Sequence, residues 1–596
     1  MGAVNAIASA ASHATPHPGN VAGQPLSLTG RRWLVAESLP RVDVAPPAEP
    51  PGLPEWAQAL LARRGISGGT ALQDYLAPSL QALPDPSRMA DLDAAVDRLC
   101  SALASGEPIN VWGDYDVDGV CATVVLVDFL RRVSDPSRLR WYIPDRRQEG
   151  YGLNTEAIET LSEHGGVLVT ADCGITAHAE LEYARVRGLD AIVVDHHQVP
   201  ETLPPARACL DPQRPDCGYG FRGLCATGVA FMLVAGLRRA LRARGWFAHR
   251  PEPDLRELLD VTALATVADM VPLVETNRVL VAAGLRWIGR GQRVGMQALC
   301  AAAGVAPEAV TASDLGFRLG PRINARGRLG HAAGAVELFL TSDRHQAERL
   351  AAHMDAANRA RKDLEQQTAA AAKQQVETQG WQDTAALVVH DASWHPGVLG
   401  LVASRLVRHF HRPAVVVGEG GKGSGRTFED LNLYEAMASG AALLDKFGGH
   451  HAAAGLTIQQ AQLPAFREAL CAAVTQSLGP PPYVPALKPD LLAAPAALAL
   501  ETVGQIERLG PFGQQNPEPL LVSEGLAVQS QRVVGGSHLK LRLGEAGVDA
   551  IGFGLAELAT DLPATVDIVY RLERNVYKGQ SRMQLNIEDI RPSTGR

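Results

Sequence analysis

The spacing of hydrophobic residues changes along the chain and divides it into parts. Between about residues 105 and 300, short apolar runs alternate with helical ones, a pattern that predicts a parallel sheet covered on both faces. After residue 486, apolar residues recur at every second position, as in 539–543, 566–570 and 583–587. Such alternation predicts half-buried antiparallel strands, and about five of them in this length would form a small β-barrel.

A long helix is predicted over residues 344–378, which contain no Gly or Pro and are rich in Ala, Gln, Arg and Glu. At 1.5 Å per residue it would be about 50 Å long. Leu350, Met354 and Leu364 form a sparse apolar seam, so most faces are polar, as in a helix that bridges two domains. A second α/β unit is expected after it, with elements at 385–389, 398–410 and 414–417.

The first residues of the chain are rich in Ala, Pro, Ser and Gly, and no Lys or Arg precedes Arg31. A secretory signal needs a basic start, so a disordered extension is expected instead. The predicted divisions are the extension at 1–54, a first α/β domain at 55–343, the connecting helix at 344–378, a second α/β domain at 379–478 and the barrel at 486–596.

Composition adds three limits. The 596 residues are 46% hydrophobic and 20% charged, which is ordinary for a globular protein. The net charge is -8, so contact with nucleic acid would have to come from local basic patches. The eight cysteines show neither a CxxC pair nor zinc spacing, which fits free thiols and a cytoplasmic location, and no apolar run reaches the ~18 residues that span a membrane.

Acidic residues gather where the first predicted strand ends. Asp114, Asp116 and Asp118 follow the apolar run 109–112 and precede the helical run 120–130. At the carboxyl end of a strand such a cluster faces the crevice where ligands bind, and its charges repel unless a cation lies among them. A solvated acidic loop is the alternative.

Three later apolar runs end in the same kind of residue and favour the metal site. Residues 167–171 precede Asp172, and 191–194 precede the triplet 195–197, Asp-His-His. Residues 265–268 precede Asp269 and are expected to be a further strand. Packing alone does not explain this repetition.

These motifs resemble, in order and over nearly all of the chain after about residue 55, the DHH phosphoesterase family, and within it the bacterial single-strand-specific exonucleases. The resemblance implies an α/β fold: a parallel-sheet DHH domain, joined by a long helix to an α/β DHHA1 domain and followed by an OB-fold β-barrel. It also implies a 5′→3′ exonuclease on single-stranded DNA that releases nucleotide 5′-monophosphates in DNA repair and recombination.

The proposed ligands suit hard divalent ions. Carboxylates and imidazoles without a thiolate favour Mg²⁺ or Mn²⁺, and the nitrogen ligands favour Mn²⁺. Two ions about 3.5–4 Å apart would bind the scissile phosphate, activate a water and stabilise the leaving oxygen. By resemblance, Asp172 bridges the ions, His197 contacts the phosphate and Asp195 orients a histidine. The implied metal ligands are Asp114, Asp116, Asp118, Asp172, His196 and Asp269.

Arginine and glycine segments supply candidate phosphate contacts. Arg146 lies in the turn 143–152, which is otherwise a surface loop, and its planar guanidinium suits a phosphate. Residues 315–330 combine four arginines with glycines that would let the backbone approach a ligand closely, although such a combination by itself usually indicates turns. Within this segment the resemblance implies roles for Arg322, Asn324 and Arg328 but none for Arg326.

The second α/β unit carries a similar set. Residues 448–455 resemble the DHHA1 signature, in which Gly448 and Gly449 expose backbone N–H groups and His450 can donate to an oxyanion. A lone histidine is otherwise a core residue. Ser424 and Arg426 are further candidates for binding phosphate.

The predicted barrel carries basic and aromatic residues that suit single strands, although solvated strand faces are often basic too. The DNA-binding candidates are Lys540, Arg542, Tyr577 and Lys578, with Tyr570, Arg571, Arg574 and Arg582 in support.

Three functions compete: the exonuclease, a phosphodiesterase or pyrophosphatase for small phosphorylated molecules, and a non-catalytic nucleic-acid-binding scaffold. The long helix and the barrel disfavour a small substrate, and the intact set of acids disfavours the scaffold. The resemblance further implies a single-stranded-DNA-binding protein and a RecQ-type helicase as partners of a monomer that has no membrane contact.

Overall fold

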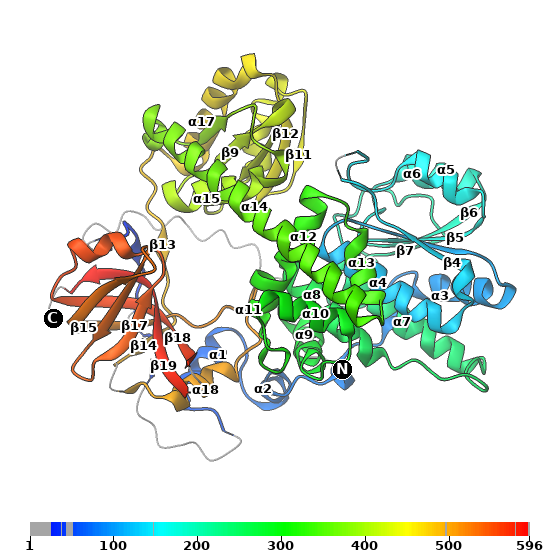
Figure 1. Ribbon diagram of the computed structural model, residues 1–596, viewed down its shortest axis with the longest axis horizontal. Helices are drawn as coiled ribbons and strands as arrows, with labels where there is room; N and C mark the ends of the chain where they lie inside the picture. Colours follow the sequence, from blue (N-terminus) through cyan, green and yellow to red (C-terminus); the bar gives the residue numbers. More distant parts are fainter. Residues whose placement is uncertain are drawn as a thin grey trace. The chain divides into compact units, whose positions relative to one another are not determined.

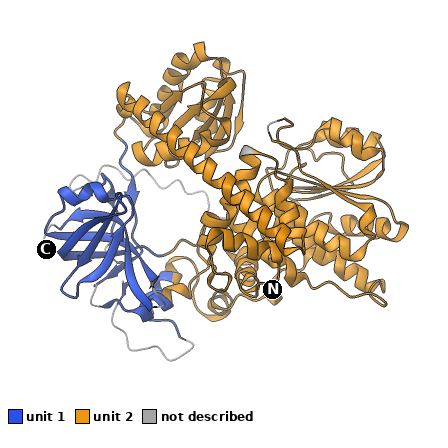
Figure 2. Ribbon diagram, viewed as in Figure 1, with its two compact units in different colours: residues 1–60, 483–504, 519–596 blue, residues 61–482, 505–518 orange. Residues whose placement is uncertain are grey.

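The computed structural model describes residues 26–36, 38–42, 52–146, 148–494, 497–577 and 580–593. It divides the chain into two compact units (Figure 2). The catalytic unit comprises residues 61–482 and 505–518, and the barrel unit comprises 1–60, 483–504 and 519–596. The expectation for residues 1–25 and the candidate Lys578 lie outside the described residues.

A five-stranded parallel sheet forms the centre of the first part of the catalytic unit (Figure 1). Val111 packs into the core on one face, whereas Trp112 packs into a separate core on the other face. The sheet is therefore covered on both faces, as its uninterrupted apolar strands require. Its order is β4 (Leu139–Tyr142), β3 (Ile109–Gly113), β5 (Gly166–Ala171), β6 (Leu189–Val194) and β7 (Ala208–Leu210).

The strand order places a crevice beside β3. The chain leaves β3 for β4 on one side and then returns to β5 on the other side. This is a topological switch point, where the carboxyl ends of the strands open a crevice for ligands. The covering helices are α3 (Leu92–Ser105), α4 (Val117–Val133) and α7 (Ala226–Ala243) on one face, and α5 (Thr155–Ser162) and α6 (His178–Val186) on the other.

The expectation that Asp269 ends a strand was wrong. The residues before it form helix α8 (Leu259–Ala268), and Asp269 is the C-cap. Most of α8 is buried, and a short apolar run that is buried on all sides has the same sequence pattern in a helix and in a strand. Helices α9 (Glu275–Ile288), α10 (Val294–Ala303) and α13 (Ala333–Leu340) follow in the same helical layer.

The turns expected at 315–330 were also wrong. The segment is a π-helical turn, Leu315–Leu319, that continues into helix α12 (Gly320–Leu329). Its glycines provide close packing: a Cβ at Gly327 would lie 2.6 Å from the backbone oxygen of Tyr115. A larger residue at this position would push α12 away from the acidic turn that contains Tyr115.

The long helix was predicted at its observed bounds, α14 (Arg344–Thr378). Ala351 and Met354 belong to the core of the first part, and Ala372 and Val376 belong to the core of the second, so α14 bridges the two parts within the catalytic unit (Figure 1). The second part has helix α15 (Leu399–Phe410) against a mixed sheet in the order β11 (Lys446–Gly449), β12 (Ala453–Thr457), β10 (Lys422–Arg426), β9 (Ala414–Val417) and β8 (Leu387–His390).

The barrel unit confirms the predicted barrel, because β15 pairs with both β18 and β16 and so closes the sheet. Tyr570, which was expected as a stacking surface, is fully buried, with its hydroxyl 3.0 Å from that of Ser523. The barrel strands are β15 (Leu521–Val534), β16 (His538–Leu543), β17 (Val548–Gly552), β18 (Thr565–Tyr577) and β19 (Gln580–Pro592).

Part of the expected disordered extension is folded. Strand β1 (Arg32–Trp33) pairs with β13 (Ala486–Leu487), and β2 (Arg41–Val42) pairs with β14 (Leu491–Ala493). The Trp33 ring is buried and its Nε1–H donates to Asp589 at 2.7 Å. Disorder was therefore the wrong expectation for these residues, because partners more than 400 positions away supply the strand pairing.

The eight cysteines are all free thiols. Within the described part of the chain, no helix has the length and apolarity that crossing a membrane would need.

Candidate metal centre

The acidic turn after β3 is fixed by its own backbone. The Asp116 carboxylate caps α4 and accepts from the N–H groups of Asp118 at 2.8 Å and Gly119 at 3.1 Å. A Cβ at Gly119 would lie 2.5 Å from the backbone nitrogen of Asp114, so only glycine lets the turn close here. Asp114 is 3% exposed and its Oδ1 has no hydrogen-bond partner.

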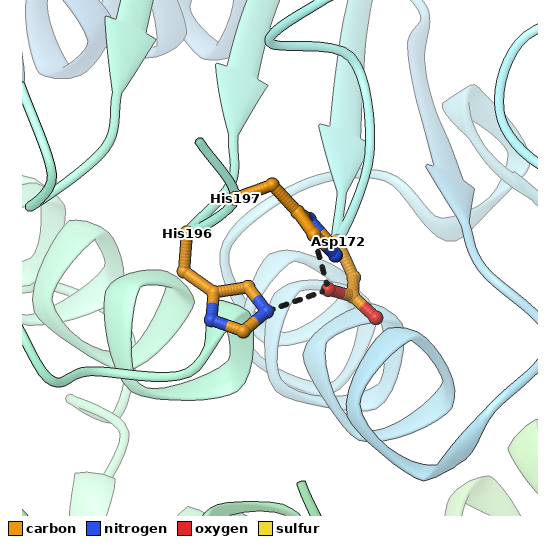
Figure 3. A group of neighbouring side chains, drawn as sticks. All are labelled: Asp172, His196 and His197. Carbon is orange, nitrogen blue, oxygen red and sulfur yellow. Dashed lines mark ion pairs between the residues drawn. The ribbon is translucent and has the colours of Figure 1, made fainter. Parts of the chain in front are cut away.

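Asp172 follows β5 in a left-handed conformation, with φ of 68°. Few residues other than glycine adopt this region, although Asp tolerates it. His196 Nε2 lies 3.3 Å and His197 Nδ1 lies 3.9 Å from Asp172 Oδ1, and both contacts end on this one oxygen (Figure 3). Two histidines from the end of β6 therefore converge on a carboxylate from the end of β5.

Three groups of side chains each bring ligand atoms within 4.8 Å of one another. Asp172 belongs to two of these groups, and so does His196. Adjacent groups that share members can hold two cations side by side. The groups are Asp114, Asp116 and Asp172; Asp172, His196 and His197; and Asp118, His196 and Asp269.

Asp118 is held by a helix that the sequence did not connect to the site. Its Oδ2 accepts from Ala226 N–H at 2.6 Å and its Oδ1 accepts from Thr227 N–H at 2.9 Å, at the start of α7. The N–H groups of a helix start attract a carboxylate. Asp118 Oδ2 still lies 3.7 Å from His196 Nε2, so the contact with α7 orients the carboxylate toward the other ligands.

The site concentrates negative charge away from water. Burial, followed by the charges of Asp118, Asp116, Asp114 and Asp269, raises the pKa of Asp172 well above its usual range. Burial is also the main cause that raises the pKa of the other acids Asp114, Asp116 and Asp269.

Some buried carboxylate oxygens in the site have no hydrogen-bond partner: Asp114 Oδ1, Asp172 Oδ1 and Asp269 Oδ2. A buried polar atom without a partner is costly. Bound divalent cations would remove both the mutual repulsion and this cost, so the side chains fit such ions.

The pKa values of the two histidines shift in opposite directions. Burial lowers the pKa of His196 and so favours the neutral imidazole that metal ligation requires. Burial is the largest single effect on His197 and acts to lower its pKa. The hydrogen bond between its Nδ1 and Asp195 Oδ1 at 2.7 Å, together with the negative charges of Asp195, Asp118 and Asp116, outweighs burial, and the pKa is raised. Asp195 also accepts from Ile175 N–H at 3.0 Å, so this carboxylate orients His197.

A cavity of about 280 Å³ opens beside these residues, near the lower end of the roughly 300–1,000 Å³ typical of ligand sites. Acids form one part of its wall and arginines another. It is lined by Asp114, Tyr115, Asp116, Arg146, Tyr151, Asp172, His197, Asp269, Asn324, Gly327 and Arg328.

The arginines of this wall repel one another. Burial, then the charges of Arg146, Arg361 and Arg426, lower the pKa of Arg328 to about 10, and Asp116 opposes them. The Arg146 guanidinium lies over the Tyr115 ring, 5.0 Å from its centroid. Guanidinium groups beside a cluster of acids are the arrangement expected for a phosphate that bridges between bound cations and arginines.

Not every predicted phosphate contact reaches this cavity. Arg322 instead forms an ion pair with Asp355 on α14, at 2.9 Å. Arg426 donates to Ser424 Oγ at 3.1 Å, and both side chains lie against Gly400 at the start of α15. Gly448, Gly449 and His450 are exposed on β11 and the turn that follows, and they do not line the cavity.

The barrel candidates are only partly described. Lys540 on β16 pairs directly across the sheet with Arg532 on β15, and like charges at such positions favour a bound anion. Arg542 lies 3.8 Å from Asp549, which offsets its charge. The side chain of Tyr577 lies outside the described residues, as does Lys578.

Tyr151 also belongs to the site, although the sequence did not predict it. Its hydroxyl donates to the backbone oxygen of Asp172 at 3.1 Å and lies 3.5 Å from His197 Nδ1. The sequence signal that could have identified it is the Gly150-Tyr-Gly152 run. Both glycines have positive φ, 87° and 86°, so the backbone around Tyr151 has a conformation that neither a helix nor a strand offers.

Comparison with known proteins identifies the class first. Residues 108–266 match the DHH family, N-terminal domain, residues 383–476 match the DHHA1 domain, and residues 489–589 match the RecJ OB domain. The chain is therefore a DHH and DHHA1 protein with an OB-fold barrel, which confirms the expected fold class.

Full-length relatives then identify the branch. The single-stranded-DNA-specific exonuclease RecJ of Dickeya dadantii is 36% identical over 561 residues, which cover 91% of this chain and 97% of that protein. The protein of the same name from Escherichia coli is 35% identical over 564 residues, with the same coverage. The crystal structure of RecJ in complex with Mn²⁺ from Thermus thermophilus matches with a TM-score of 0.77 and 31% identity, over 95% of this chain and 80% of that one. The chain belongs to the RecJ family.

Proposed function

We propose that this chain is a metal-dependent exonuclease that degrades single-stranded DNA from the 5′ end and releases nucleotide 5′-monophosphates. Single-stranded DNA is the substrate in the names of its full-length relatives. The polarity and the product rest on the resemblance of its motifs to that family.

One observation supports the chemistry most directly: Asp114, Asp172 and Asp269, each with an orphaned oxygen, line one polar cavity, and His196 Nε2 lies 3.3 Å from Asp172 and 3.7 Å from Asp269. This donor set suits Mn²⁺ or Mg²⁺, and related structures contain one or the other ion. Two such ions, when bound, would polarise the scissile phosphate and supply a water of lowered pKa.

The chain's own residues would position the substrate. Arg146 and Arg328 would hold phosphate oxygens at the arginine wall of the cavity, and Asn324 keeps α12 against the acidic turn by accepting from Val117 N–H at 3.2 Å. His197, held by Asp195 and with a raised pKa, would donate a hydrogen bond to the phosphate. Ser424 and Arg426 would bind a phosphate further along the strand.

The metal ligands proposed are the six already named from the sequence, with Asp172 shared between two ions. His450, Gly448 and Gly449 are proposed as backbone and imidazole contacts to DNA, because they are exposed and free to approach it. On the barrel, Lys540 with Arg532 is the favoured DNA contact, and Arg542, Tyr577 and Lys578 are kept as candidates.

The same proposal includes the borders predicted for the two α/β domains and the helix between them, a cytoplasmic location and a monomeric state. It also includes partnership with a single-stranded-DNA-binding protein and a RecQ-type helicase. They rest on the family resemblance. The second candidate is a DHH phosphodiesterase for small molecules, whose substrate would not need an additional domain that binds nucleic acid.

The test uses three substrates labelled at either end: a duplex with a 5′ single-stranded overhang, a duplex with a 3′ overhang and a blunt duplex, each with Mn²⁺. We expect loss of the 5′ label as mononucleotide from the first substrate alone. Equal rates on the blunt duplex, or attack from the 3′ end, would refute the proposal, and hydrolysis of a cyclic dinucleotide in preference to DNA would favour the second candidate.

A further inference from the structure

The segment Gln505–Glu518 belongs to the catalytic unit although both of its chain neighbours belong to the barrel unit. The chain therefore passes from the barrel unit into the catalytic unit at residue 505 and goes back to the barrel unit after residue 518. Residues 509–516 of this segment, called here the return loop, make the contacts that follow.

A buried arginine holds the return loop. Arg278 on α9 is 3% exposed, and its guanidinium donates to the backbone oxygens of Leu509 at 3.2 Å, Gly510 at 2.6 Å and Pro511 at 3.3 Å. It also donates to the backbone oxygen of Tyr75 and lies 3.7 Å from the centroid of the Tyr75 ring. Burial lowers the pKa of Arg278, so the carbonyls stabilise a charge that is kept from water.

The return loop is closed on itself by Asn516, which is 2% exposed. Its amide nitrogen donates to the oxygens of Leu509 at 3.3 Å and Pro511 at 2.9 Å, and its amide oxygen accepts from the Tyr75 hydroxyl at 3.0 Å. The loop is thus a rigid piece of the catalytic unit.

The rigid loop contacts the turn that carries Asp269. Leu273 N–H donates to the backbone oxygen of Gln514 at 2.7 Å. The Leu273 side chain packs on Gly513, where an added Cβ would lie 2.9 Å from it. Asn277 binds the same turn from the other side by donating to the Pro272 oxygen at 2.9 Å. Residues 272 and 273 are fixed in this way only three and four positions after Asp269.

Asp269 needs such support. It stands at the C-terminal end of α8, and Met270 after it has a positive φ of 59°, an uncommon conformation that persists only when its surroundings impose it. Its Oδ2 has no hydrogen-bond partner and lies 3.7 Å from His196 Nε2. No hydrogen bond from another side chain therefore directs this oxygen, and the backbone of the turn decides where it points.

We infer that Arg278, Asn516 and the return loop are positioning residues for Asp269, and that they set its carboxylate for a divalent cation shared with Asp118 and His196. The inference rests on the proposed metal role of Asp269. Groups that orient a metal ligand without touching the ion change affinity by about 10–100-fold when removed.

The test measures Mn²⁺ binding to the full-length protein by the loss of the free-ion EPR signal, beside the kcat and KM for single-stranded DNA. Arg278→Met and Asn516→Ala are each compared with Arg412→Met. Arg412 is a matched control, a buried arginine that donates to the backbone oxygens of Phe410 and Thr384 in the second part of the unit. Asp269→Asn is the reference for a lost ligand.

We expect Arg278→Met and Asn516→Ala to weaken one class of Mn²⁺ site about tenfold and to lower kcat at limiting Mn²⁺ with KM for DNA unchanged. Excess Mn²⁺ should restore kcat in these variants but not in Asp269→Asn. Arg412→Met should bind Mn²⁺ as the wild type does, even if its melting temperature falls equally.

Wild-type Mn²⁺ affinity in both Arg278→Met and Asn516→Ala, beside weakened binding in Asp269→Asn, would overturn the inference but not the proposed function. An equal loss of affinity in Arg412→Met would do the same. Unchanged Mn²⁺ binding in Asp269→Asn would overturn the proposed ligand and the inference with it. If Arg278→Met does not fold, Asn516→Ala gives the same decision.

Discussion

His196 Nε2 lies 3.3 Å from Asp172 Oδ1, at the meeting point of two strand ends. Burial lowers the pKa of the imidazole and raises that of the carboxylate. Both shifts disfavour the charged form of the side chain. Because ligation of a metal needs a deprotonated carboxylate and a neutral imidazole, a divalent ion would compete with protons for these two residues, and metal binding should weaken as pH falls.

Asp172→Asn should abolish nuclease activity at every Mn²⁺ concentration, by roughly a thousandfold or more, because it changes a ligand that belongs to two groups. The metal-free variant should melt no lower than the metal-free wild type, since one buried acid is removed. Nucleotide release and thermal unfolding check both statements. Asp97→Asn, at an exposed position paired with Arg244, is the control, and substantial turnover of Asp172→Asn at saturating metal would contradict the shared role.

Arg328→Gln should raise KM for single-stranded DNA about tenfold and reduce the salt dependence of binding by about one phosphate contact. Arg322→Gln is the matched control on the same helix, because Arg322 is paired with Asp355 outside the cavity. Binding isotherms at several salt concentrations distinguish the two variants. The same change in both would show that α12 contributes stability rather than a phosphate contact.

Asp211 should make stability depend on pH. Burial raises its pKa to about 7, so between pH ~4 and ~7 the folded state holds a proton that the unfolded state has lost, and stability falls as pH rises through this window. Asp211→Asn removes this pH dependence, which from the size of the pKa shift amounts to at most about 4 kcal/mol in the free energy of unfolding. Melting temperatures should be equal near pH 4 and higher for the variant at pH 8; a variant less stable than the wild type at pH 8 would contradict the assignment.

Lys540→Ala combined with Arg532→Ala should weaken binding to long single strands and shorten each degradative run, while hydrolysis of a dinucleotide stays the same. The reason is that the two cations are cross-strand neighbours on β15 and β16 of the barrel, which carries none of the proposed metal ligands. Arg344→Ala, at an exposed position on α14, is the control for a lost surface charge. A parallel fall in dinucleotide hydrolysis would show that the barrel takes part in the chemistry.

The clustering of the acids could be predicted from the sequence because the rule behind the prediction is local. Asp114, Asp172 and Asp195 each end an apolar run, and carboxyl ends of parallel strands meet at one edge. Asp269 was placed correctly near the others for a wrong structural reason, since its run is a buried helix. The bounds of α14 could also be predicted from the sequence, because a long stretch without Gly or Pro strongly favours a helix.

The phosphate contacts could not be separated without knowing that residues 320–329 are helical. Asn324 and Arg328 are four positions apart and share one face of α12, the face that lines the cavity. Arg322 is six positions from Arg328, about 120° away around the helix, and meets α14 instead. Contacts such as that between Arg278 and Leu509 join chain segments 231 positions apart, and no local sequence pattern predicts them.

The return loop also governs how this protein can be divided or recombined. A single cut at the Pro-rich linker near residue 482 would leave Arg278 buried without three of its carbonyl acceptors and Leu273 without Gln514. A catalytic fragment would therefore have to extend through Glu518. An exchange of barrel units between relatives would need one crossover on each side of the segment 505–518, in addition to those near residues 60 and 482. The chain crosses the border between the two units three times after residue 482, so the barrel could be replaced as a module only if the loop stayed with the enzyme.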